Sequence, residues 1–418
     1  MSKQEFSIIY QRLAYYSNEK YEAFIELDKA KKLVITYEND SLLLLIRRTE
    51  LKYLSALDFK TISEKQLVNK QMKINEVLKY ARTLNQHTQL YDILKHRLIN
   101  KGYIRSDKQK EDLNDLVLSE LHLIANNSYQ GFEAQKLHLL FQATYYLNSG
   151  NYKSAIRYYQ ELINLFNDNQ HLILNPPIYY LSAIQGILDS LCIAGLYHET
   201  PFFLSKLEEL TQNEYSTEFI LHLKTLIYIY KSNSLLQAGN FEQALELRDK
   251  QENELLKKVT SLGLESQLRL YLSFAVLGMY TKDYVQARKY MKKIFSLGKL
   301  FCAFPSYKIA RLVNLLLQAE LGNYDFFENE IISIKRNIRF EKQTYITEKL
   351  IFKFIQGYPL PSYEKARNKR WLQYQKDIQK IEQDKYERQL LKTFDVLAWI
   401  ESKLTQRSLA DIFAEKAH

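Results

Sequence analysis

Histidine, cysteine and clustered carboxylates carry most catalysis and metal binding, and here they lack the spacings that such chemistry needs. None of the eight histidines forms a His-Glu-x-x-His or His-x-x-x-His pair, and Cys192 and Cys302 lie far apart. The glycines are isolated, so the sequence has no phosphate-binding loop and no Gly-x-Ser-x-Gly elbow. We therefore expect a protein that is not an enzyme and that has no cofactor or metal site.

A group of basic residues lies between Tyr284 and Ala319, a span that contains no Asp or Glu. Four of the cations recur at the spacing of one helix face: Arg288, Lys289, Lys292 and Lys293. Such a face can bind an acidic helix or a phosphate backbone, but an ordinary solvated face has the same pattern. The sequence leaves open a solvated surface, an acidic protein partner and, least favoured, nucleic acid.

The helices that position these residues are marked by a recurring turn. Each copy starts with Gly or Lys and has an aromatic residue two positions later. In most copies a small residue follows three positions after the aromatic residue. The copies are Gly150-Asn151-Tyr152 with Ala155, Gly195-Leu196-Tyr197 with Thr200, Gly239-Asn240-Phe241 with Ala244, Lys282-Asp283-Tyr284 with Ala287, and Gly322-Asn323-Tyr324 with Phe327. Successive turns lie 40 to 45 residues apart. A helix-turn-helix unit with such a period predicts an array of helical hairpins.

These residues resemble the tetratricopeptide repeat, most closely at Gly150, Tyr152 and Ala155 with Ala143, and at Gly239, Phe241 and Ala244. The resemblance implies an all-α fold, a right-handed α-solenoid of degenerate hairpins. The chain is also similar to a group of helical-repeat proteins of the Bacteroidetes type, in the stretches 27–33 and 394–400. That group has no assigned activity, so this second resemblance implies architecture only.

In the tetratricopeptide family the first helix of each pair lines the concave face. Counting back from each turn gives two inward positions per helix. The first set is Leu140, Gln185, Ile229, Leu272 and Leu312, and the second is Thr144, Asp189, Asn233, Val276 and Leu316. Family members that clamp a peptide carboxylate carry Lys and Asn there, which this sequence lacks apart from Asn233. We expect no such clamp. Gln185, Asp189 and Asn233 form a candidate polar strip for a peptide backbone, with solvated groove residues as the alternative.

The chain divides by composition into three parts: residues 1–131 with irregular helical hairpins, 132–356 with five repeats, and 357–418 with a charged helix and a helix that caps the array. Asn39 to Ser41 is predicted to end one helix and cap the next, and Asn85 to Thr88 to break a long helix. Thr200 is predicted to cap a helix with Pro201 at its first position, and Pro305 is predicted to open another helix. Gly102 is predicted to end a helix. The stretch from Gly357 to Ser362 is predicted to be a linker, and 125–131 a loop.

The bulk composition fits a helical binding protein. The net charge is +10, the chain has only 11 Gly and 6 Pro, and no apolar run approaches the roughly 20 residues of a membrane span. Few cysteines and no leader-like N-terminus favour a reducing, cytoplasmic location. The leading hypothesis is a scaffold that binds a protein or peptide of unknown identity. The alternatives are a regulatory peptide sensor and an acidic or nucleic-acid partner on the basic face.

Overall fold

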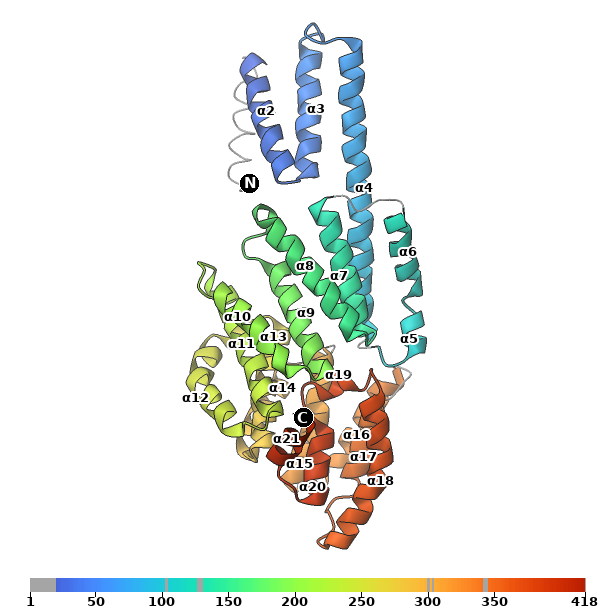
Figure 1. Cartoon of the computed structure of the whole chain (residues 1–418), viewed down its shortest axis with the longest axis vertical. Helices are drawn as coiled ribbons and strands as arrows, with labels where there is room; N and C mark the ends of the chain where they lie inside the picture. Colours follow the sequence, from blue (N-terminus) through green and yellow to red (C-terminus); the bar gives the residue numbers. More distant parts are fainter. Residues whose placement is uncertain are drawn as a thin grey trace. The chain divides into compact units, whose positions relative to one another are not determined.

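The computed structural model describes residues 20–101, 104–125, 131–298, 301–302, 304–340 and 345–417, and every regular element in them is a helix (Figure 1). The prediction of an all-α fold is confirmed. The helices form two compact units. The first takes in the described residues of Met1–Leu94, Leu113–Phe141 and Glu161–Leu174, and the second those of Lys95–Asp112, Gln142–Gln160 and Asn175–His418. The three-part division by composition stays a prediction.

Three long helices contribute residues to both units: α4 (Glu64–Lys101), α7 (Phe132–Asn148) and α8 (Tyr152–Asp168). The first unit also contains α2 (Lys20–Thr36), α3 (Asp40–Ala56), α6 (Asn114–Ala125) and the 3-10 turn η2 (Gln170–Leu172). The second unit also contains α5 (Asp107–Glu111), η3 (Tyr197–Glu199), η4 (Val259–Ser261) and the helices α9 (Ile178–Ala194), α10 (Thr200–Leu210), α11 (Thr217–Gln237), α12 (Phe241–Lys257), α13 (Leu264–Tyr280), α14 (Tyr284–Ser296), α15 (Pro305–Glu320), α16 (Phe326–Phe340), α17 (Ile346–Ile355), α18 (Glu364–Gln383), α19 (Arg388–Leu391), α20 (Val396–Thr405) and α21 (Leu409–Ala417).

In the first unit, α2 and α3 form an antiparallel pair. A side chain caps the start of α3 directly after α2 ends. Asn39 Oδ1 accepts a hydrogen bond from Leu42 N at 3.1 Å, as the sequence predicts. The apolar stripe of α2 buries Leu27, Ala30 and Val34 against α3 and α4, while Ile25 and Leu33 of the same helix stay exposed. The buried stripe is therefore narrower than the apolar pattern of the sequence.

The break predicted at Asn85 to Thr88 is wrong, because α4 runs through these residues without interruption. Its polar side chains are satisfied without leaving the helix. Thr88 Oγ1 donates back to Leu84 O at 3.0 Å, and buried His87 lies 3.5 Å from the Glu120 carboxylate of α6. His138 of α7 contacts the same carboxylate at 2.7 Å. A polar cluster thus joins three helices of the first unit, which the local sequence does not reveal.

The predicted turns of the second unit all have the left-handed backbone that ends a helix. The φ angle is 77° at Gly150, 78° at Gly195, 74° at Gly239, 62° at Lys282 and 73° at Gly322. Small residues pack fully buried after four of the turns, at Ala155, Thr200, Ala244 and Ala287. These turns join antiparallel pairs of helices, and α13 and α14 form one such closely packed pair. At Gly278 of α13 an added Cβ would lie 2.9 Å from backbone atoms of α14, so this pair needs glycine there.

Prolines mark two predicted helix starts in the second unit, and only one of them folds as expected. Pro305 opens α15 as predicted, and 356–363 connects α17 to α18 as the predicted linker. Thr200 is not the cap of α10, because it is already helical and its Oγ1 donates to Tyr197 O at 2.7 Å. The 3-10 turn before it satisfies the first amide of α10, because the Thr200 N–H donates to Tyr197 O. The loop predicted at 125–131 and the helix stop at Gly102 fall mostly outside the described residues.

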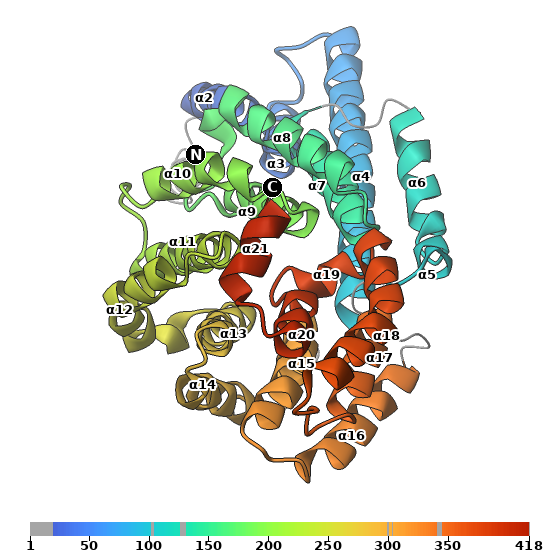
Figure 2. The ribbon, with the colours of Figure 1, turned by 60° about the horizontal axis from the view of Figure 1, so that its bottom comes forward.

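The C-terminal part of the chain is not one helix that covers the last repeat. It comprises the charged helix α18 followed by α19, α20 and α21, and these last three lie on the inner side of the arc formed by α9 to α16 (Figure 2). It contacts several successive turns. Tyr152 OH donates to Lys385 O at 2.6 Å, Phe394 stacks on Tyr280 with centroids 4.9 Å apart, and Lys403 Nζ lies 2.5 Å from Glu320. The single capping helix is therefore corrected to a segment that packs along the pairs.

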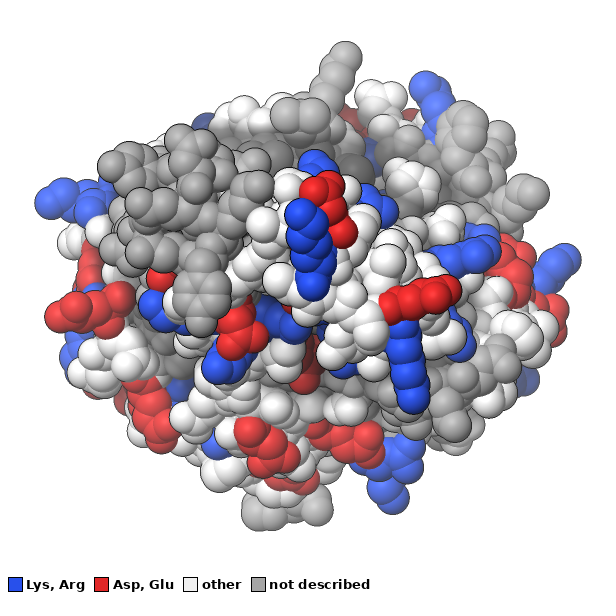
Figure 3. Space-filling view, turned by 90° about the horizontal axis from the view of Figure 1, so that it is seen from above, with Lys and Arg blue, Asp and Glu red and all other residues white. Residues whose placement is uncertain are grey.

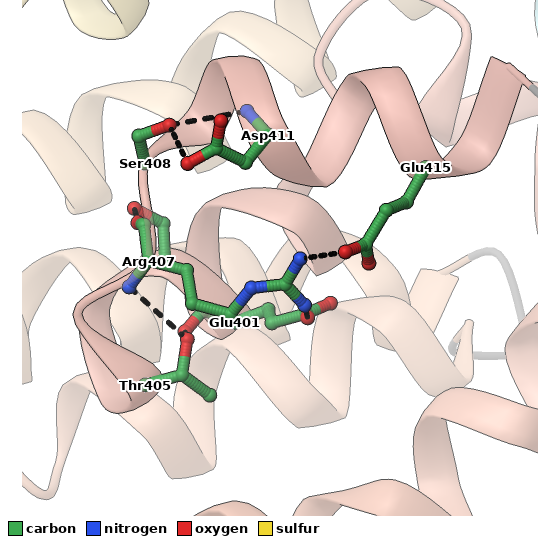
Figure 4. Close-up of polar contacts among 7 residues, drawn as sticks. Glu401, Thr405, Arg407, Ser408, Asp411 and Glu415 are labelled. Atoms are coloured by element: carbon green, nitrogen blue, oxygen red, sulfur yellow. Dashed lines mark hydrogen bonds and ion pairs between the residues drawn. The ribbon is translucent and has the colours of Figure 1, made fainter.

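A compact polar turn joins α20 to α21 (Figure 4). Arg407 pairs with Glu401 of α20 at 3.3 Å and also with Glu415 of α21. Ser408 Oγ accepts from Asp411 N at 3.1 Å, which caps the start of α21. This turn places Phe413, which is fully buried, against the rings of Phe241 and Tyr280.

Candidate functional site

Six of the ten inward positions expected from the repeat pattern line one cavity of about 120 Å³ in the second unit. Gln185 and Asp189 come from α9, Ile229 and Asn233 from α11, and Leu272 and Val276 from α13. The register counted back from the turns brings these six residues together, whereas Leu140, Thr144, Leu312 and Leu316 are not among the lining residues. The remaining lining includes Tyr230, Arg269, Lys392 and Thr393, which the sequence argument does not single out.

Asp189 is the centre of the polar lining. Its Oδ1 lies 3.3 Å from Lys392 Nζ and 3.3 Å from Arg269 Nη2, and it accepts a hydrogen bond from Tyr230 OH at 2.9 Å. Arg269 Nη2 also donates to Tyr230 OH at 3.1 Å. The Asp189 side chain is only 16% exposed, so these partners replace most of the water that a carboxylate needs.

The electrostatics keep this carboxylate ionised. Burial acts to raise the pKa of Asp189, but the charges of Lys392 and Arg269 outweigh it, so the pKa lies below its usual value. Burial raises the pKa of the neighbouring Cys192 thiol to about 12. A thiol with so high a pKa is a poor nucleophile, so buried Cys192 is suited to packing rather than to nucleophilic chemistry.

Asn233 binds the main chain of an irregular segment. Its Nδ2 donates to Lys392 O at 3.1 Å, and Lys392 belongs to the linker between α19 and α20. Gln185 takes part through its main-chain oxygen, which accepts from Tyr230 OH at 3.4 Å. Of the three residues in the predicted polar strip, Asp189 and Asn233 contact this linker by side chain. Binding of a partner at the strip stays a prediction.

The basic residues of α14 are less uniform than their spacing suggests. Lys289 lies 3.6 Å from Glu252 of α12, and Lys293 lies over the rings of Tyr271 and Tyr290. Arg288 and Lys292 are exposed and have no ion pair among the described residues. The span from Tyr284 to Ala319 contains no acidic residue, but acidic residues of other helices pair with its cations. Arg311, for example, pairs with Glu330 of α16 at 2.7 Å.

Two charged residues of the site carry a sequence signal that the repeat analysis missed. Asp189 is the only charged residue of the apolar helix α9, and Arg269 lies between two leucines of α13. A buried charge in an apolar helix needs a partner of opposite sign, so the sequence positions of Asp189 and Arg269 indicate an ion pair between them. Lys392 has no comparable signal, because it lies in a linker far along the chain.

Among the described residues on the face drawn in Figure 3, charges of both signs are interspersed, without a continuous patch of either. No group of three or more His, Cys, Asp or Glu in the described residues is placed to hold a metal ion. Within the same residues, each helix is too short or too polar to cross a membrane.

The second unit is thus an all-α arrangement of helical pairs with a polar cavity on its inner side. No protein-family model, curated protein or solved structure matches the chain.

Proposed function

We propose that this protein is a non-enzymatic scaffold that binds another protein or a peptide through the inner surface of its helical pairs. The supporting observation is the hydrogen bond from Asn233 to a main-chain oxygen, made beside the ion pair between Asp189 and Lys392. Together these contacts hold both the backbone and a cationic side chain of a non-helical segment. Peptide-binding grooves combine the same two kinds of contact, main-chain hydrogen bonds for affinity and side-chain sites for specificity.

We further propose that the pairs from α7–α8 to α15–α16 are degenerate tetratricopeptide-like hairpins in a right-handed solenoid, in a cytoplasmic protein. Left-handed turn residues and fully buried alanines support the hairpin assignment. A regulatory peptide sensor is a narrower version of the same proposal, since it needs the same groove.

A second candidate is an acidic protein partner at α14. It is favoured by Val285, which is 79% exposed, beside the exposed cations Arg288 and Lys292. The pairing of Lys289 with Glu252 weakens it, and nucleic acid is less favoured still. Replacing Arg288 and Lys292 together by Glu should abolish retention of such a partner and leave binding at the groove unchanged.

Site-specific crosslinking in the source cells tests the scaffold. A photoreactive residue is placed in the full chain at Glu265, an exposed residue at the cavity, or at Lys250, an exposed control on α12. We expect a discrete protein adduct from position 265 that is absent from position 250. The additional substitution Asn233→Ala should reduce the adduct. No adduct at position 265, or the same adducts at both positions, would refute the proposal.

A further inference from the structure

The linker between α19 and α20 occupies the candidate groove of its own chain, which is the inner surface around the cavity that Gln185, Asp189 and Asn233 line. It consists of Lys392, Thr393, Phe394 and Asp395, which are not helical. It contacts Asp189 of α9, Asn233 of α11 and Tyr280 of α13, and it joins α19 to α20. The groove therefore displays, within one molecule, the chemistry by which it holds an extended chain.

Three contacts define that chemistry. The Lys392 ammonium lies 3.3 Å from Asp189, and the Lys392 carbonyl accepts from Asn233 at 3.1 Å. Two residues further on, the Phe394 ring stacks on Tyr280 with an interplanar angle of 14°, and Asp395 N donates to Tyr280 OH at 2.6 Å. The pattern is a lysine and an aromatic residue separated by one position, with one main-chain hydrogen bond at the lysine carbonyl and another at the amide that follows the aromatic residue.

The residue between them does not fill its space. Thr393 lines the cavity of about 120 Å³, together with apolar side chains such as Leu272, Val276 and Ile309. A larger side chain at this position would bury apolar surface that Thr393 leaves uncovered, and each additional buried methylene should tighten binding about fourfold. A foreign segment with such a residue has an advantage over the protein's own linker.

We propose, building on the scaffold function, that the partner binds through an extended segment with a lysine, a large apolar residue and an aromatic residue in succession. This segment replaces Lys392, Thr393 and Phe394 in the groove. The linker competes with it, because a tethered segment acts at an effective concentration in the millimolar range. Partner binding and release of the linker are therefore coupled.

The test measures fluorescence anisotropy of labelled peptides with the full chain. The reference peptide copies residues 389–397, Gln-Leu-Leu-Lys-Thr-Phe-Asp-Val-Leu. One variant peptide replaces its lysine by alanine, and another replaces its threonine by leucine. The chain variant Lys392→Ala weakens the internal competitor and leaves Asp189 paired with Arg269. Circular dichroism and thermal unfolding confirm that this chain is folded before binding is measured.

We expect Lys392→Ala to bind the reference peptide at least tenfold tighter than the wild-type chain does. On the Lys392→Ala chain, the alanine peptide should bind at least tenfold more weakly than the reference, and the leucine peptide several-fold more tightly. Equal affinities for the lysine and alanine peptides, or no binding of any peptide, would overturn the inference.

A second measurement uses the wild-type chain and does not depend on any substitution. Excess leucine peptide should accelerate hydrogen exchange at the Asp395 amide, which donates to Tyr280 in the closed state. Unchanged exchange at saturating peptide contradicts the proposed replacement. The two proposals fail separately. A crosslinked partner with no lysine preference overturns only this inference, whereas the absence of any crosslink at position 265 overturns the scaffold itself.

Discussion

Replacing Asp189 by Asn should destabilise the second unit by about 3 kcal/mol. The substitution keeps the shape of the side chain and an acceptor for Tyr230, but it removes the negative charge from between Lys392 and Arg269. Breaking a buried ion pair from one side costs about 3–5 kcal/mol, because a charge is left without compensation. The residual 16% exposure of Asp189 places the expected loss at the lower end of that range.

Urea unfolding followed by circular dichroism measures this loss. A matched control is Lys224→Gln, which removes a cation from an exposed pair with Glu254, whose side chains are 42% and 58% exposed. That change should alter the free energy of unfolding by less than about 0.5 kcal/mol. If Asp189→Asn changes stability no more than the control does, the Asp189 ion pairs do not hold the groove together and the reasoning fails.

The difference in unfolding free energy between wild type and Asp189→Asn should depend on pH in one direction. The pKa of Asp189 is lower in the folded chain than in the unfolded chain, so its stabilisation is fully present above about pH 4, near the unfolded value. It is lost as the pH falls through the folded pKa. The gap between wild type and Asp189→Asn should therefore be constant from pH 6 to 8 and shrink in acid. A gap that widens in acid would contradict this assignment.

Three further substitutions, one of them with a control, test the packing of the helices, the first two by thermal unfolding and the third by hydrogen exchange. Gly278→Ala places a Cβ 2.9 Å from backbone atoms of α14 and should cost about 2 kcal/mol, whereas Gly263→Ala, with no atom within 4 Å, should cost below about 1 kcal/mol; equal effects would refute the close approach. Lys282→Gly removes a side chain from a residue with φ of 62° and should stabilise by about 1 kcal/mol, so a lower unfolding temperature would contradict the assigned strain. Glu120→Gln removes the charge between two histidines and should destabilise the first unit by about 2 kcal/mol at pH 7, measured by hydrogen exchange in α6, where unchanged protection would argue against the cluster.

The turns and the register of the helical pairs are predictable because local rules determine them. Glycine or a polar residue at a helix end favours the left-handed conformation, and it appears even at Lys282, where only the repeat period indicates a turn. Counting back from these turns brings Gln185, Asp189 and Asn233 to one cavity. Short-range chemistry therefore sets the inward positions.

Features that depend on distant contacts escape the same reasoning. The continuity of α4 rests partly on the contact between His87 and Glu120, which a window of neighbouring residues cannot show. The position of Lys392 in the groove depends on Asn233, 159 residues earlier in the chain. Sequence periodicity identifies the surface that receives a segment, but not the segment that reaches it.

The C-terminal segment also has a consequence for synthesis. Gly150 and Gly239 do more than end helices, since an added Cβ would lie 2.9 Å from the Lys385 side chain at one and 3.0 Å from Ala410 O at the other. These close contacts form only after the last helices have left the ribosome. Until then the inner surface of a nascent chain is uncovered, although its helical pairs are already complete. Truncated or stalled products would therefore expose the inner surface of the helical pairs without the segment that covers it in the full chain.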